Sequence, residues 1–202
     1  SINGASDAVM QDIREVIPID FPVSSFTLDL DHMKKVITGL GPVKEVDLRI
    51  HGGGILEIKI IERTPAILWR RDAGLEVLDQ TGTYVTSITS RLDYPTLPLI
   101  AGEDADSRIK EANLLFKAAE PLKDRVRGFV LIGKRRWNIV LDREQTLMLP
   151  EQNPVASLEQ IIVLNDAYEL LDRDVRAVDF RIENRPTLHL TLGAVKELND
   201  IK

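Results

Sequence analysis

Apolar and polar residues alternate along two neighbouring stretches in the first third of the chain. Residues 43–50 carry apolar side chains at mostly alternate positions, and residues 55–61 repeat the pattern. A period of two is typical of a half-buried β-strand. The sequence His51-Gly52-Gly53-Gly54 between the stretches is typical of a turn, so they predict a β-hairpin.

Two helices are predicted before this hairpin, over 8–16 and 32–40. Each follows side chains whose oxygens can accept from the free amides of a first helical turn. Ile2-Asn3-Gly4 is typical of the end of a strand and its turn, so residues 1–63 predict the order β-α-α-β-β. The expected caps are Ser6 or Asp7 and Asp29 or Asp31, and the expected stops of the second helix are Gly39, Gly41 and Pro42.

Residues 64–202 predict a different unit, in which short strands surround two amphipathic helices over 105–119 and 157–171. Strands are expected over 66–70, 75–78, 84–87, 127–132, 137–141, 146–149, 177–182 and 187–192. We therefore predict the α+β class, with a mainly antiparallel β-sheet domain after the first unit. Pro65 lacks an amide for a ladder and marks the boundary, and Trp69 is expected to pack at this seam.

Composition removes several functions. The chain has 202 residues, a formal net charge of -6 and no cysteine. An acidic chain is a poor binder of phosphate, so nucleic acid is not expected as a partner. The lack of cysteine excludes disulfides, thiolate metal sites and cysteine nucleophiles. No apolar run reaches the roughly 18 residues that cross a bilayer, and the abrupt start leads us to expect an anchoring segment before residue 1.

No enzyme, metal or cofactor is predicted. His51-Gly52-Gly53-Gly54 matches an oxyanion motif of some esterases, but the chain has no G-x-S-x-G nucleophile motif. The three histidines lack the close spacing of a zinc site. Two acidic clusters, Asp29/Asp31 and Glu103/Asp104/Asp106, stand where helices are expected to begin, which favours capping over catalysis or cation binding.

Two features remain as candidates for binding. Lys134-Arg135-Arg136-Trp137 is typical of a solvated turn that leads into a core tryptophan, although arginine there could also bind a partner carboxylate. The final stretch 187–192 alternates strictly and has only about ten residues after it. It is either an exposed edge strand, which is a template for another chain, or a strand that the tail covers.

The ordered motifs of the chain resemble one bacterial family. Glu62-Arg63-Thr64-Pro65-Ala66-x-x-Trp69, followed by Asp79-x-x-Gly82, resembles the cell-division family FtsQ, called DivIB in Gram-positive bacteria. Trp137-x-x-x-Leu141, Leu147-x-Leu149-Pro150 and Val178-Asp179-Phe180-Arg181 fit the same family in order and spacing. The β-α-α-β-β unit that ends in Glu-Arg-x-Pro also resembles a POTRA module.

This resemblance implies a non-enzymatic scaffold of the divisome, with a POTRA domain at 1–63 and a β domain at 64–202. It implies an inner-membrane protein with a single spanning helix, whose present region is periplasmic and acts at the division septum. FtsB and FtsL would bind the β domain by strand addition, and FtsK would contact the POTRA domain. The implied contact residues are Arg181, Ile182, Asn184, Pro186, Leu188 and Leu190, together with a basic residue that pairs with a partner carboxylate, which is either Lys134 or Arg135.

One alternative comes from the POTRA resemblance itself. Such modules also bind substrate polypeptides in outer-membrane assembly and secretion proteins. Those proteins usually carry several such units or a barrel, whereas this sequence predicts a single unit and a β domain with helices.

Overall fold

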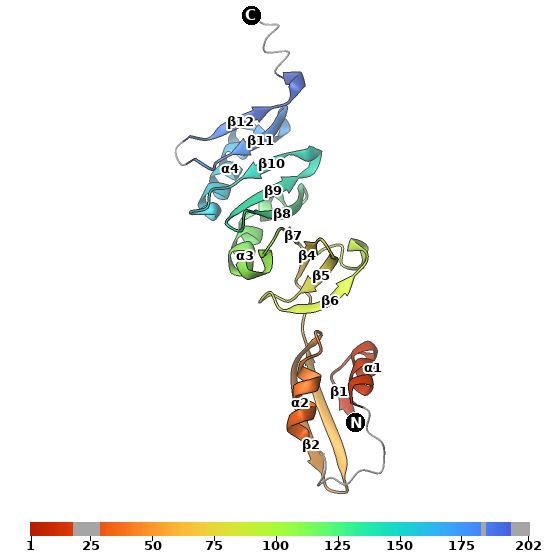
Figure 1. Cartoon of the computed structure of the whole chain (residues 1–202). Helices are drawn as coiled ribbons and strands as arrows, with labels where there is room; N and C mark the ends of the chain where they lie inside the picture. Colours follow the sequence, from red (N-terminus) through yellow and green to blue (C-terminus); the bar gives the residue numbers. More distant parts are fainter. Residues whose placement is uncertain (18–28, 183–184, 195–202) are drawn as a thin grey trace, which may run out of the picture.

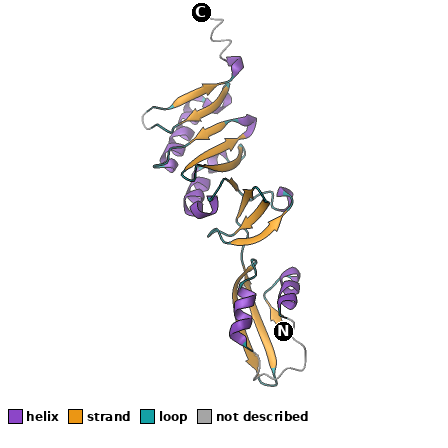
Figure 2. Cartoon of the chain, in the orientation of Figure 1, coloured by secondary structure: helices purple, strands orange, loops and turns teal. Residues whose placement is uncertain are grey.

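The computed structural model describes residues 1–17, 29–182 and 185–194, and it forms two β-sheets that follow one another along the chain (Figure 1). The smaller sheet and its helices come from the first 62 residues. The larger sheet comes from residue 67 onward, and its helices lie on one face (Figure 2). Both sheets contain parallel and antiparallel pairs, and both are accompanied by helices, which confirms the α+β class.

The first unit has the predicted order. Its elements are β1 (Ile2–Asn3), α1 (Asp7–Val16), α2 (Leu30–Thr38), β2 (Val43–His51) and β3 (Ile55–Glu62). The strand order is β1-β3-β2, with β1 parallel and β2 antiparallel to β3. Asp29 caps α2, because its carboxylate accepts from the His32 amide at 2.9 Å. The assignment of this unit as a POTRA module stays a proposal.

A small core holds the first unit together. Ile13 of α1 and Ile37 of α2 are almost fully buried, and they pack with Val46, Ile58 and Ile60 of the sheet. This packing explains the alternation along β3. One face of the hairpin packs against the helices, and the other face is exposed at Ile61.

The larger sheet has nine strands among the described residues, in the order β12-β11-β10-β9-β8-β7-β4-β5-β6. Five of its eight pairings are antiparallel, so the predicted mainly antiparallel character is confirmed. The strands are β4 (Ile67–Arg71), β5 (Gly74–Leu78), β6 (Tyr84–Ile88), β7 (Leu99–Ala101), β8 (Val126–Ile132), β9 (Arg136–Leu141), β10 (Thr146–Met148), β11 (Val175–Asp179) and β12 (Thr187–Leu190).

Two helices cover one face of this sheet, α3 (Ile109–Ala118) and α4 (Pro154–Tyr168). The main core lies beneath them, with Trp137 fully buried and Leu115 and Leu158 packed around it. Trp137 Nε1 donates to Glu111 at 2.9 Å, which satisfies the polar atom of the buried indole. The turn before Trp137 therefore leads into a core tryptophan, as predicted.

Several boundaries differ from the prediction. α4 begins at Pro154 and not at residue 157, because proline is favoured at the first helical position. The helix predicted over 105–119 starts as a 3-10 turn, Ala105–Arg108. Strand β11 ends at Asp179 and not at 182, because Arg181 turns back to bind the Asp179 carboxylate.

Strand β7 was not predicted, because two prolines and a glycine surround its three residues. It is nevertheless central, with β4 on one side and β8 on the other, both parallel to it. The expectation for Trp69 was also wrong. This side chain lies in the main core, where Nε1 donates to the Gly102 carbonyl at 3.2 Å, because β4 lies inside the large sheet and not at its border.

The chain passes from one sheet to the other at Thr64 and Pro65. The Arg63 amide donates to the Pro42 carbonyl of the first unit at 2.7 Å, and the Ala66 amide donates to the Leu78 carbonyl of the second at 2.9 Å. Arg63 also reaches across this passage, since Nη1 donates to Asp79 Oδ2 at 2.8 Å. Whether residues 1–63 and 64–202 fold as independent domains stays a prediction.

Candidate binding edge of the large sheet

Strand β12 is an outer strand of the nine-stranded sheet (Figure 1). It pairs with β11 only, antiparallel, and no strand of the described ranges lies on its other side. All four residues of β12 are exposed. An outer strand of this kind presents unpaired amides and carbonyls to which another chain can add.

The register identifies which main-chain groups face outward. The Thr191 amide donates inward to the Asp174 carbonyl at 2.9 Å. Successive residues of a strand direct their amide and carbonyl groups to opposite sides. The groups of His189 therefore point toward β11, where it faces Ala177, and those of Leu188 and Leu190 point to the open side.

The same two leucines carry apolar side chains. Leu188 lies opposite Val178 and Leu190 opposite Val175, and both valines are buried in the main core. The leucines therefore lie on the helix-covered face, yet Leu188 is 45% exposed and Leu190 is 39% exposed. Leu192, just past the strand, is exposed as well. The open edge thus combines free main-chain groups with a stripe of incompletely covered leucines.

The other face of β11 and β12 carries a charged cluster. Arg181 Nε donates to both Asp179 oxygens at 2.9 and 3.0 Å, and Nη2 donates to Oδ2 at 2.6 Å. His189 Nε2 lies 3.7 Å from the same carboxylate. The Arg181 guanidinium lowers the pKa of the Asp179 carboxyl and outweighs the opposing effect of burial. Arg181 therefore fixes the bend after β11, and its fork is already engaged within the chain.

The basic turn lies at the end of the sheet where β12 begins. Asn138 of β9 pairs with Met148, Met148 with Asp179, and Asp179 with Thr187. Lys134 and Arg135 immediately precede β9, so they stand three strand spacings, roughly 14 Å, from the start of β12. The sheet thereby brings residues about fifty positions apart in sequence to one end.

The two basic side chains of this turn differ in their surroundings. Lys134 Nζ pairs with Glu103 at 2.6 Å and Asp104 at 2.9 Å. We expected this acidic cluster to cap a helix, and for these two residues the expectation was wrong. The backbone of Asp104 has a left-handed conformation, and its side chain makes no capping hydrogen bond. Arg135 approaches only Glu151, at 3.9 Å, and its side chain is 63% exposed. Arg135 is thus the freer of the two cations.

A cavity of about 460 Å³ lies just before the start of β12, between the segment that follows β11 and the segment that leads into α4. Pro150, Glu151 and the first turn of α4 form one wall. Residues 180–182 and Pro186 form the other, so three of the predicted contact residues, Arg181, Ile182 and Pro186, line it. Ile182 is 62% exposed.

The structure brings most of the predicted contact residues together at one end of the large sheet. The side chain of one of them, Arg181, is already bound to Asp179. Ile182, Pro186, Leu188 and Leu190 lie along or beside the open edge, and Lys134 and Arg135 lie at its end of the sheet. Asn184 is outside the described residues. Sequence reasoning missed that Asp179 and His189 join Arg181 in one cluster. The alternation of 187–192 already indicated that His189 and the leucines lie on different faces of the strand. Only the pairing of β12 with β11 shows that His189 lies beside Asp179.

The glycine turn joins the two strands of the first hairpin. His51 Nε2 lies 2.8 Å from Glu57 Oε2, in the next strand of the hairpin. Gly53 and Gly54 adopt positive φ angles, which explains why glycine is needed there. Within the described ranges, no group of three His, Asp or Glu residues is placed to hold a metal ion. No helix in the same ranges is long and apolar enough to cross a bilayer.

Taken together, the fold and the edge define an α+β protein with an exposed, apolar-lined strand at the end of a large sheet. The model of the C-terminal region of cell division protein FtsQ/DivIB matches residues 67–181. The chain is 46% identical to cell division protein FtsQ of Roseobacter litoralis over 191 residues, 95% of this chain and 65% of that protein. It is 45% identical to FtsQ of Paracoccus denitrificans, covering 96% of this chain and 57% of that protein.

The chain belongs to the FtsQ/DivIB family of cell division proteins. FtsQ of Dinoroseobacter shibae is 44% identical over the whole of this chain and 68% of its own length. The chain thus spans 57–68% of the length of these three relatives. The resemblance to the FtsQ/DivIB family noted in the sequence is confirmed.

Proposed function

We propose that this chain is the non-enzymatic scaffold region of a divisome protein, and that it docks FtsB, with FtsL, by strand addition to β12. One observation carries the proposal: among the described residues β12 pairs with β11 alone, and its outward main-chain groups and half-exposed leucines occur at the same positions, 188 and 190. The main-chain hydrogen bonds and the side-chain contacts that strand addition requires are thereby available along one edge.

The energetics of such an interface are favourable without a deep pocket. Each added main-chain hydrogen bond contributes about 0.5–1.5 kcal/mol net. Burial of the exposed parts of Leu188 and Leu190 adds about 25 cal/mol per Å² of apolar area. Backbone bonds give affinity, and the side chains that fill the spaces beside the leucines give specificity.

Charge at the sheet end supports a fixed partner register. The exposed Arg135 can bind a partner carboxylate with its planar fork, whereas Lys134 is held by Glu103 and Asp104. A partner that lies along β12 and continues past its start reaches the 460 Å³ cavity beside Ile182 and Pro186. Arg135 stands on the far side of that cavity, next to Glu151.

The remaining parts of the proposal follow from family membership. The full-length protein is anchored in the inner membrane by one helix, and the present region lies in the periplasm. The first unit is a POTRA domain that contacts FtsK. The alternative, a substrate-binding POTRA module of outer-membrane assembly or secretion, receives no support from the relatives, which are named as cell division proteins.

Calorimetric titration with a peptide from the periplasmic end of FtsB tests the proposal. The wild-type chain should bind it saturably, and Leu190→Lys should weaken binding at least tenfold, because a charged side chain would be buried against the added strand. Leu114→Lys is the matched control, since Leu114 is also an exposed leucine but lies on α3. Equal affinities of wild type and Leu190→Lys would contradict the proposed site.

A further inference from the structure

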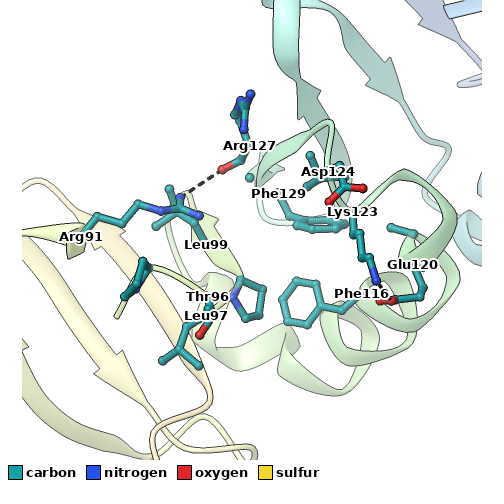
Figure 3. Close-up of a pocket in the computed structure, with 15 residues that line it drawn as sticks. Arg91, Thr96, Leu97, Leu99, Phe116, Glu120, Lys123, Asp124, Arg127 and Phe129 are labelled. Carbon is teal, nitrogen blue, oxygen red and sulfur yellow. Dashed lines mark hydrogen bonds and ion pairs between the residues drawn. The ribbon is translucent and has the colours of Figure 1, made fainter. Parts of the chain in front are cut away.

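A second cavity, of about 600 Å³, lies at the middle of the large sheet, away from β12 (Figure 3). The connection that leads from β6 into β7 forms one wall, with Pro95, Leu97 and Pro98. Phe116 of α3 and the first residues of β8 form the other. The volume falls within the range of roughly 300–1,000 Å³ that is usual for ligand sites.

The wall of this cavity is preformed. Proline fixes φ, so Pro95 and Pro98 limit the conformations of the connecting segment. The Pro98 carbonyl accepts from the Leu68 amide at 2.9 Å, which ties the segment to β4. Phe116 and Phe129 pack edge to face with ring centroids 4.8 Å apart. A ligand would therefore meet an apolar surface that needs little reorganisation.

The Arg91 guanidinium lies at this apolar surface, and the other basic residues that line the cavity are Lys123 and Arg127. Arg91 Nη1 donates to the Arg127 carbonyl at 3.2 Å, which holds the guanidinium at the cavity (Figure 3). This bond uses one of its five donors. No acidic side chain of the described residues forms an ion pair with Arg91, in contrast to Lys123 on the opposite wall, which pairs with Glu120 at 2.8 Å. The cavity thus offers an unneutralised guanidinium on one side only.

From this arrangement we infer that the cavity binds a short extended peptide segment of a partner protein, with an acidic side chain next to an aromatic or aliphatic one. The carboxylate is bound by Arg91 in a charge-assisted pair. The neighbouring apolar side chain lies against Phe116 and Leu99. The opposite wall carries Glu120 and Asp124 together with Lys123, so its net charge is negative, and the carboxylate is favoured at Arg91 and not at that end.

The inference is independent of strand addition at β12, because the two surfaces share no residue. Nuclear magnetic resonance titration of the ¹⁵N-labelled chain with acetyl-Gly-Phe-Glu-Leu-Gly-amide tests it. We expect saturable shifts at the amides of residues 96–99 and 126–129. The peptide with Gln in place of Glu should bind at least tenfold more weakly, because it loses the charge-assisted pair.

Two arginines allow a matched comparison. Arg91→Gln should lower the affinity for the Glu peptide at least tenfold and leave the affinity for the Gln peptide unchanged. Arg176→Gln should change neither, because Arg176 is an exposed arginine of β11 and does not line the cavity. Phe116→Leu keeps the wall apolar but removes the ring, so it should lower the affinity for both peptides several-fold. This variant provides a test that does not depend on Arg91.

Three results would overturn the inference. The first is an absence of shifts at these amides with millimolar Glu peptide. The second is equal affinity for the Glu and Gln peptides, which would remove the role of Arg91. The third is that phenylacetate alone binds as tightly as the Glu peptide, which would identify a site for small organic acids and not for a peptide.

Discussion

Arg63 and Asp79 join the end of the first sheet to the start of the second, with Nη1 of the arginine 2.8 Å from Oδ2 of the aspartate. Asp79 also accepts from the amides of Thr81 and Thr83 at 2.8 and 3.0 Å. One carboxylate therefore closes the turn between β5 and β6 and holds the segment that connects the sheets. Both residues belong to motifs that resemble the family, and their contact gives those motifs a physical reason.

Replacement of Asp79 by Asn should destabilise the chain by about 2 kcal/mol near neutral pH. Burial by itself raises the pKa of Asp79, but hydrogen bonds from Thr81, Thr83 and Arg63 outweigh it and lower the pKa from 3.8 to about 2. A shift of this size corresponds to about 2 kcal/mol. Urea unfolding of wild type and variant measures the difference, and Asp72→Asn, an exposed carboxylate in the β4–β5 turn, is the control.

The same contribution should depend on pH in a defined direction. Because the folded-state pKa is depressed, the stabilisation is complete above the ordinary value of 3.8 and disappears as the pH falls toward about 2. The difference between wild type and Asp79→Asn should therefore shrink over this acidic window. A difference that stays constant down to pH values near 2 would show that Asp79 acts through packing and not through its charge.

Local patterns in the sequence predicted the fold well where they agree with tertiary structure. The alternation of 43–50 and 55–61 predicted the hairpin, and Asp29 predicted a cap. Strand β7 could not be predicted, because its three residues carry no periodicity and owe their extended form to β4 and β8 on either side. Trp69 was misplaced for a related reason: only the strand order shows that β4 is an inner strand.

The binding edge was predictable in part. The strict alternation of 187–192 indicated a final strand but left open whether the tail covers it, and β12 is an outer strand among the described residues. The ambiguity between Lys134 and Arg135 could not be resolved from sequence. It depends on Glu103 and Asp104, about thirty residues away, which the fold brings to Lys134.

Gly41→Val should disrupt the contact between the first unit and β6. A side chain at Gly41 would collide with the Val85 carbonyl, and its Cβ would lie 2.9 Å from the Tyr84 ring. Forced overpacking costs about 1–3 kcal/mol. Hydrogen exchange at Val85 and Thr86 should rise in this variant. Gly52→Ala is the control, because nothing lies within 4 Å of its added Cβ, and equal exchange in both variants would contradict the contact.

Arg135→Gln should weaken binding of the FtsB peptide, whereas Lys134→Gln should change it little. Arg135 is exposed and makes a single long ion pair within the described residues, with Glu151 at 3.9 Å, while Lys134 already pairs with two carboxylates. An exposed pair contributes up to about 1 kcal/mol, which corresponds to roughly a fivefold loss of affinity. Titration of both variants at low and high salt measures this, and a larger effect of Lys134→Gln would reverse the assignment.

The most direct test of the central claim is amide hydrogen exchange along β12, with and without a saturating FtsB peptide. In the free chain the amide of His189, which faces β11, should be protected, and those of Leu188 and Leu190 should exchange rapidly. Strand addition predicts that the peptide protects Leu188 and Leu190 strongly and changes His189 little. A bound peptide that leaves the amides of Leu188 and Leu190 in rapid exchange would contradict docking at this edge.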